Sequence, residues 1–155
     1  MKLAKYFKTD DGSLPEIEVS FNTHAQVAAA FQHLYDRGAV NVTLGPNNVW
    51  SRFNHSERPY SGPSDAALVG SREIDPFHVV LRSVCGSDIP VPDLGVFVFP
   101  DSLTIDYRMG DGWGEPQIDS LLKLLGQLRL LGGSVSVPWW GVEGESDFLN
   151  ALGGA

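Results

Sequence analysis

The chain has 155 residues, of which 43% are hydrophobic and 19% are charged. These values indicate one ordinary globular domain with its own core, and they exclude a disordered chain. With 11 basic and 19 acidic residues the formal net charge is −8, and no basic cluster is visible, so neither nucleic acid nor an anionic membrane is an expected partner.

The cysteine content and the apolar segments indicate the cellular compartment. The single cysteine, Cys85, excludes an internal disulfide framework. The N-terminal segment lacks the apolar run of a secretory signal peptide, and no window is long and apolar enough for a membrane span. We therefore expect a cytoplasmic protein of bacterial type.

The first expected element is a β-hairpin of residues 1–8 and 16–21, because the second segment alternates polar and apolar side chains. An amphipathic helix follows, capped by Asn22 or Thr23 and ending near Arg37. Its apolar residues recur at spacings of three and four, which places them on one side of the helix.

Two short strands are expected next, at residues 41–44 and 49–53, with a turn between them. Residues 54–75 are rich in Ser, Pro, Gly and charged side chains, and only residues 66–69 resemble a turn of helix. We expect a long polar loop over 54–75. Loops of this length in compact domains are usually functional, so a binding surface is expected there first.

The second half of the chain has stronger periodicity. Its expected elements are three strands, a long helix, a further strand and a short terminal helix, at residues 77–84, 94–99, 102–109, 116–131, 134–137 and 147–152. The second and third of these strands form a tight hairpin. A glycine-rich joint, residues 110–115, leads from the third strand into the long helix.

The order of elements predicts the fold class. A hairpin, a helix, a glycine and a strand occur near residues 1–44 and again near 94–137, which suggests a topological duplication. We expect a single α+β domain, residues 1–155, with a mostly antiparallel sheet and two main helices packed on one face. Each helix makes a crossover, right-handed if the strands that it joins are parallel.

No cofactor or metal is expected. The joint Gly110-x-Gly112-x-Gly114 matches neither the dinucleotide nor the P-loop spacing, and the flanking acidic residues would repel a phosphate. Those carboxylates lack the order of a calcium loop, and the four histidines lack the paired spacing of zinc ligands. A structural entry into the helix is the simpler interpretation of the joint.

An enzyme is less favoured than a binding protein, but it stays open as an alternative. The run Asn54–Arg58 offers a base, a hydroxyl and an acid, yet the chain has no Gly-x-Ser-x-Gly elbow. A small hydrolase-like enzyme or a small-ligand-binding domain would use the 54–75 loop, with His55 as base and Glu57 or Asp111 as its partner.

The chain resembles bacterial toxin-immunity proteins in architecture and composition. The resemblance is carried by a small acidic α+β chain, by the hairpin VFVFPDSLTIDY at residues 96–107 and by the Gly112–Trp113–Gly114 turn into an amphipathic helix. It implies a cytosolic antidote that binds a toxin domain and occludes its active site. Negative charge would then steer the protein toward a basic toxin surface.

The leading hypothesis is a non-catalytic protein-binding domain. Tryptophans near element ends support it, and consecutive Trp139 and Trp140 would leave at least one indole exposed. The residues expected to contact the partner are His55, Glu57, Arg58, Tyr60, Asp111, Trp113 and Glu115. A third interpretation is a subunit that assembles through an exposed sheet edge, and the sequence leaves the oligomeric state open.

Overall fold

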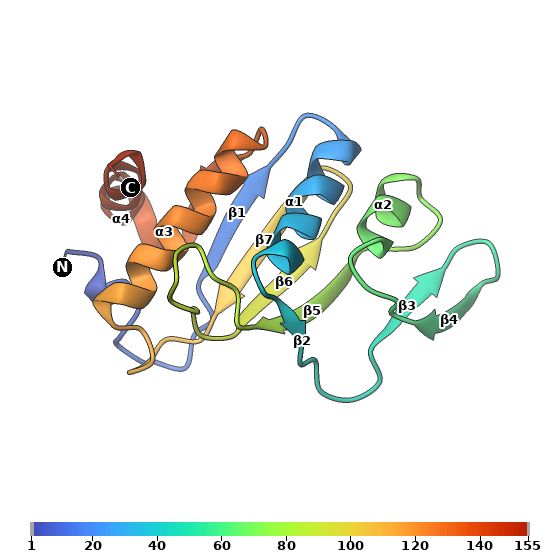
Figure 1. Cartoon of the computed structure of the whole chain (residues 1–155), viewed down its shortest axis with the longest axis horizontal. Helices are drawn as coiled ribbons and strands as arrows, with labels where there is room; N and C mark the ends of the chain where they lie inside the picture. The colour runs from blue at the N-terminus through green and yellow to red at the C-terminus, as the bar shows by residue number, and fades with distance from the viewer. Residues whose placement is uncertain (1, 155) are drawn as a thin grey trace.

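The structure, a computed structural model, describes residues 2–154 (Figure 1). The strands in these residues are β1 (Glu16–Ser20), β2 (Val40–Asn41), β3 (Asn48–Ser51), β4 (Ser56–Pro59), β5 (Phe77–Arg82), β6 (Leu94–Val98), β7 (Ser102–Tyr107) and β8 (Ser134–Ser136). The helices are α1 (His24–Asp36), α2 (Asp65–Gly70), α3 (Glu115–Leu130) and α4 (Gly141–Gly153), with short 3-10 turns at Ala4–Tyr6 and Pro138–Trp140. The expected α+β class is confirmed.

Six strands form one sheet in the order β2-β5-β6-β7-β1-β8, and every neighbouring pair is antiparallel. Strands β1 and β2 therefore point the same way, as do β7 and β8, because an odd number of strands separates each pair. Helix α1 links the first pair and α3 links the second, so both helices are crossover connections. Both lie on the same face of the sheet, as expected (Figure 1).

Buried and exposed residues alternate along the strands, so one face of the sheet is covered and the other is open. In β1, Ile17 and Val19 are fully buried toward the helices, whereas Glu16, Glu18 and Ser20 are exposed on the other side. The covered face holds the core, to which α1 and α3 contribute a row of apolar side chains. No helix in the described part of the chain covers the opposite face (Figure 1).

Local signals set the ends of α1. The Thr23 hydroxyl accepts a hydrogen bond from the amide of Gln26, and the Gln26 side chain accepts one from the amide of Thr23. This capping box satisfies donors that the first turn leaves unpaired. The predicted cap at Thr23 is confirmed, and the helix ends at Asp36, one residue before the expected position.

The expected N-terminal hairpin is wrong, and its residue 1 lies outside the described residues. Ala4–Tyr6 form a 3-10 turn, and β1 pairs with β7 and β8 instead. Leu3 and Phe7 flank this turn, and both are buried in the core. The first half of the proposed duplication therefore lacks the hairpin. The two halves have in common only a strand–helix–strand crossover.

The segment between α1 and β5 also differs from the expectation. Strand β2 pairs with β5 rather than with residues 49–53, and β3 pairs with β4 in a separate hairpin. The expected loop over 54–75 contains β4 and α2, and α2 packs on α1. At the other end of the chain, α4 is longer than the helix expected over 147–152.

Residues 2–154 contain four α-helices, whose length and hydropathy bear on membrane insertion. None of them is both long enough and apolar enough to cross a bilayer. The longest, α3, has charged residues along its length, and all of its leucines except the exposed Leu130 are buried in the core.

Candidate binding surface

The seven residues expected to contact a partner lie in two separate places. Strand β4 and its turns, at one end of the molecule, carry His55, Glu57, Arg58 and Tyr60. The turn before α3, near the other end, carries Asp111 and Trp113, and Glu115 is the first residue of that helix (Figure 1). The fold therefore does not bring the two groups together, and Asp111 cannot act as the partner of His55.

Arg58 holds β4 against α2. Its guanidinium donates two hydrogen bonds to the buried carboxylate of Asp65, at 2.9 and 3.3 Å, and this pairing raises the pKa of Arg58. Burial by itself would raise the pKa of Asp65, but hydrogen bonds from Arg58 and from the amide and hydroxyl of Ser61 outweigh burial and hold that pKa below its usual value. The Arg58 guanidinium is thus already engaged in a contact within the protein.

Tyr60 also faces inward. Its hydroxyl lies 2.6 Å from the hydroxyl of Tyr35 on α1, and burial raises the pKa of Tyr60. His55 and Glu57 are exposed, and His55 has a positive φ of 49° at the turn of the β3–β4 hairpin. The Glu57 carboxylate accepts a hydrogen bond from Asn48 rather than from His55, so the general-base pair expected in this segment is not formed.

Trp113 belongs to the core, so its expected role as a surface contact is wrong. Its side chain is 1% exposed and lies 4.9 Å from Phe7 and 5.3 Å from Tyr107 between ring centroids. The indole N–H donates to the carbonyl of Arg108 at 2.9 Å. Of its neighbours in the joint, Glu115 lies in the first turn of α3, where a carboxylate suits the helix dipole.

The open face of the sheet offers a better candidate surface. Two aromatic side chains, Phe97 on β6 and Phe99 just after it, are stacked with ring centroids 4.6 Å apart and planes 10° apart. Phe97 is 36% exposed although it lies in the middle of the sheet order. Aromatic residues, Phe among them, are enriched at protein interfaces relative to the rest of the surface.

A hollow of about 520 Å³ lies beside this pair. In the sheet register Phe97 is opposite Thr104 on β7, and Thr104 is opposite Glu18 on β1. An aromatic ring, a short hydroxyl side chain and a carboxylate therefore stand on three neighbouring strands. The hollow is lined by Glu16, Glu18, Phe97, Phe99, Asp101, Ser102 and Thr104.

A further carboxylate, that of Asp106, is held in place on this face. Asp106 on β7 reaches over β6, and its Oδ2 lies 2.8 Å from Nε2 of His78 on β5. Gly95 lies beneath the carboxylate, and a Cβ at this position would overlap it. The absence of a side chain at Gly95 is thus what lets Asp106 and His78 meet.

Negative charge on the open face is poorly compensated. Glu16 stands directly opposite Asp106, and none of β1, β6, β7 and β8 contains Lys or Arg. Arg82 on β5 is already paired with Asp93 through two hydrogen bonds of 2.9 and 3.0 Å. Like charges on directly opposed strand residues are destabilising. A positively charged partner would relieve this repulsion.

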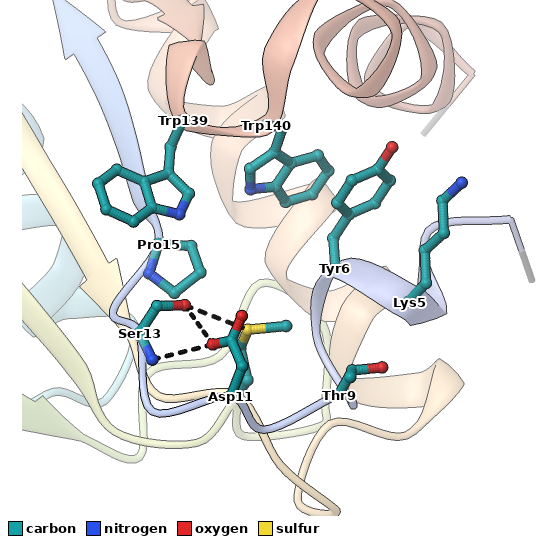
Figure 2. Close-up of a pocket in the computed structure, with 9 residues that line it drawn as sticks. Lys5, Tyr6, Thr9, Asp11, Ser13, Pro15, Trp139 and Trp140 are labelled. Atoms are coloured by element: carbon teal, nitrogen blue, oxygen red, sulfur yellow. Dashed lines mark hydrogen bonds between the residues drawn. The ribbon is translucent and has the colours of Figure 1, made fainter.

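A different hollow, of about 410 Å³, lies between the N-terminal segment and the Pro138–Trp140 turn (Figure 2). Trp139 is 58% exposed, whereas Trp140 is 8% exposed and stacks on Tyr6 with a 4.3 Å centroid distance. One exposed indole of the pair was expected and is confirmed. Among the residues that line the hollow, Ser13 donates hydrogen bonds that lower the pKa of the exposed Asp11.

Sequence reasoning missed the open face. Its signal was present in the alternation of residues 16–21 and in the hairpin at 96–107, whose outward side chains can be identified from the strand period alone. Neither hollow is lined by residues of the 54–75 segment. Within residues 2–154, no three His, Cys, Asp or Glu side chains are placed to hold a metal ion.

Comparisons of this chain with family models, with curated proteins and with solved structures found no significant match. The function therefore has to follow from the chemistry of its own surface. That chemistry is an uncovered sheet face with stacked aromatic rings and with carboxylates that have no Lys or Arg partner within residues 2–154.

Proposed function

We propose that the protein is a non-catalytic, cytoplasmic protein-binding domain whose open sheet face docks a positively charged protein surface. The observation that carries the proposal is the stacked pair of Phe97, which is 36% exposed, and the half-buried Phe99, beside Glu16 and Glu18, which form no salt bridge within residues 2–154. Aromatic anchors supply binding energy, and complementary charge supplies specificity and fast association. The net charge of −8 supports the same kind of partner.

The resemblance to toxin-immunity proteins suggests a class for this partner. We propose a basic toxin domain whose active site the open face would occlude. A face is better suited to this task than an edge. The edge strands β2 and β8 have only two and three residues, and short edge strands offer little backbone for pairing with another chain. This argues against the alternative of assembly through a sheet edge.

The decisive experiment compares two charge reversals. The tagged protein is co-expressed with proteins encoded near its gene, and binding of a captured partner is measured by calorimetry for Glu18→Lys and Glu57→Lys. Both glutamates are exposed, and each accepts one side-chain hydrogen bond, so the two variants are closely matched. Only Glu18 lies on the open face.

We expect Glu18→Lys to weaken the complex at least about tenfold and Glu57→Lys to leave it unchanged, because a close like-charge contact across an interface costs several kcal/mol. Affinity should also fall as salt rises. A partner whose binding is lost only in Glu57→Lys would refute the open face as the site. For a toxin partner, growth rescue by co-expression should follow the same order.

A second candidate function is binding of a small ligand in the hollow of Figure 2, and the exposed indole of Trp139 favours it. The volume lies within the range of ligand pockets. A thermal-shift screen tests it. A compound that raises the melting temperature of the wild type but not of Trp139→Ala supports this site, and hits that are indifferent to Trp139→Ala contradict it.

A further inference from the structure

We propose that the hollow above β7 is a receptor for one arginine side chain of the partner. In this arrangement the guanidinium stacks on the Phe97–Phe99 pair and donates hydrogen bonds to the carboxylates of Glu16 and Glu18. The inference rests on the proposed function, because it names the group that a basic partner inserts into the open face.

The spacing of the walls suits a flat cation. Neighbouring strands lie about 4.8 Å apart, so Phe97 and Glu18, which are separated by one strand, stand on walls about 10 Å apart. The floor between them consists of Ser102 and Thr104, whose side chains are short. A planar group therefore has room to stack on one wall and to reach the other with its N–H groups.

The chemistry of the lining favours arginine over lysine. Glu16 and Glu18 are two residues apart on one strand and point to the same side, so they present two carboxylates in a row. An arginine has five donors in a planar fork and also stacks on aromatic faces, whereas a lysine offers a compact and strongly hydrated charge. Cation–π contacts in proteins involve arginine more often than lysine.

The remaining acidic side chains of the face are consistent with this assignment. The Asp106 carboxylate already accepts a hydrogen bond from His78, which leaves Glu16 and Glu18 as the acceptors beside the aromatic rings. Asp101 lies at the rim of the same hollow and adds to its negative charge. The electrostatic attraction is thus centred where the guanidinium would stack.

Other occupants fit less well. An apolar segment would bury two carboxylates without counter-charges, which is costly. A second copy of this chain would bring the same acidic strands together, since Arg82 is the only Lys or Arg in the five strands β1, β5, β6, β7 and β8 and it is paired with Asp93. A basic surface with a protruding arginine is the complementary choice.

The test uses two peptides of equal charge, capped hexa-arginine and capped hexa-lysine, titrated into the whole protein by calorimetry. We expect the wild type to bind the arginine peptide about two- to fivefold more tightly, as an exposed cation–π contact provides. The double variant Phe97→Leu/Phe99→Leu keeps apolar side chains on the face and should lose this preference while it binds hexa-lysine as before.

Glu18→Gln should weaken binding of both peptides, whereas the matched Glu57→Gln control should leave both unchanged. Circular dichroism and melting temperature verify that each variant is folded. Equal affinity of the wild type for the two peptides, or a preference that survives the double phenylalanine variant, overturns the arginine receptor. A captured partner that still depends on Glu18 would in that case leave the proposed function standing, so the two failures are distinguishable.

Discussion

The stability of the fold should depend strongly on Asp65. Among the carboxylates that form salt bridges in residues 2–154, its side chain is the most deeply buried, at 1% exposed. It accepts two hydrogen bonds from Arg58 and two from Ser61. Asp65→Ala removes all four and leaves the Arg58 guanidinium without its counter-charge. Breaking a buried ion pair costs about 3–5 kcal/mol.

The lower end of that range applies here. The Arg58 side chain is 33% exposed, so its charge can turn toward water once Asp65 is absent. We therefore expect a loss of about 3 kcal/mol. For a domain of this size 1 kcal/mol shifts the melting temperature by about 2–4 °C, so the expected decrease is roughly 6–12 °C. Thermal and urea unfolding followed by circular dichroism measure it.

The matched control is Asp93→Ala. Asp93 also accepts two hydrogen bonds from an arginine, Arg82, but its side chain is 40% exposed and that of Arg82 is 61% exposed. Exposed pairs contribute little, so the melting temperature should hardly change. A decrease for Asp65→Ala no larger than that for Asp93→Ala would show that the Arg58–Asp65 pair does not stabilise this part of the fold.

The pH dependence of the same variant has a defined sign. The folded-state pKa of Asp65 is lowered from its usual value of 3.8, so the carboxylate stabilises the fold above that pH. This contribution is lost as the pH falls below 3.8 and through the lowered folded-state pKa. The difference in stability between the wild type and Asp65→Ala should therefore be constant near neutral pH and should shrink in acid.

Three further substitutions are expected to have measurable effects. Ser120→Ala removes a buried hydroxyl that donates to the Ile89 carbonyl and accepts from two backbone amides, so urea unfolding should show a loss of about 1–3 kcal/mol. Trp113→Ala should cost about 3–5 kcal/mol, yet partner affinity of the folded fraction should stay unchanged. Gly95→Ala should displace the Asp106 carboxylate and cost about 1–3 kcal/mol in urea unfolding; a variant as stable as the wild type would contradict that geometry.

The elements predicted well are those whose signals lie within the element itself. Helix α1 is capped at Thr23, as predicted, because the capping box is formed by residues three positions apart. The β6–β7 hairpin and α3 carry strong alternation or helical periodicity around a short connection. Alternation also located the buried side of β1, although its strand partner was assigned wrongly.

The elements predicted poorly depend on contacts that are distant in sequence or lie between elements. In sequence, residues 54–75 look like a loop. Their structure is held by the Arg58–Asp65 pair and by the contact of Tyr60 with Tyr35, and no local sequence pattern indicates either contact. In the same way, Trp113 was expected on the surface because it follows a strand in a glycine-rich turn. Its burial results from packing on Phe7, more than a hundred residues earlier in the chain.

The candidate site has the same dependence on topology. Residue types alone do not bring Glu18 near Phe97, since 79 positions separate them in the chain. They become neighbours across one strand only because β7 pairs with β6 on one side and with β1 on the other. In that order β1 lies between β7 and β8, and the crossover through α3 connects these two strands. The acidic and aromatic sides of the hollow are therefore a product of the sheet order, and a sequence in which β1 paired elsewhere would have the same residues without the site.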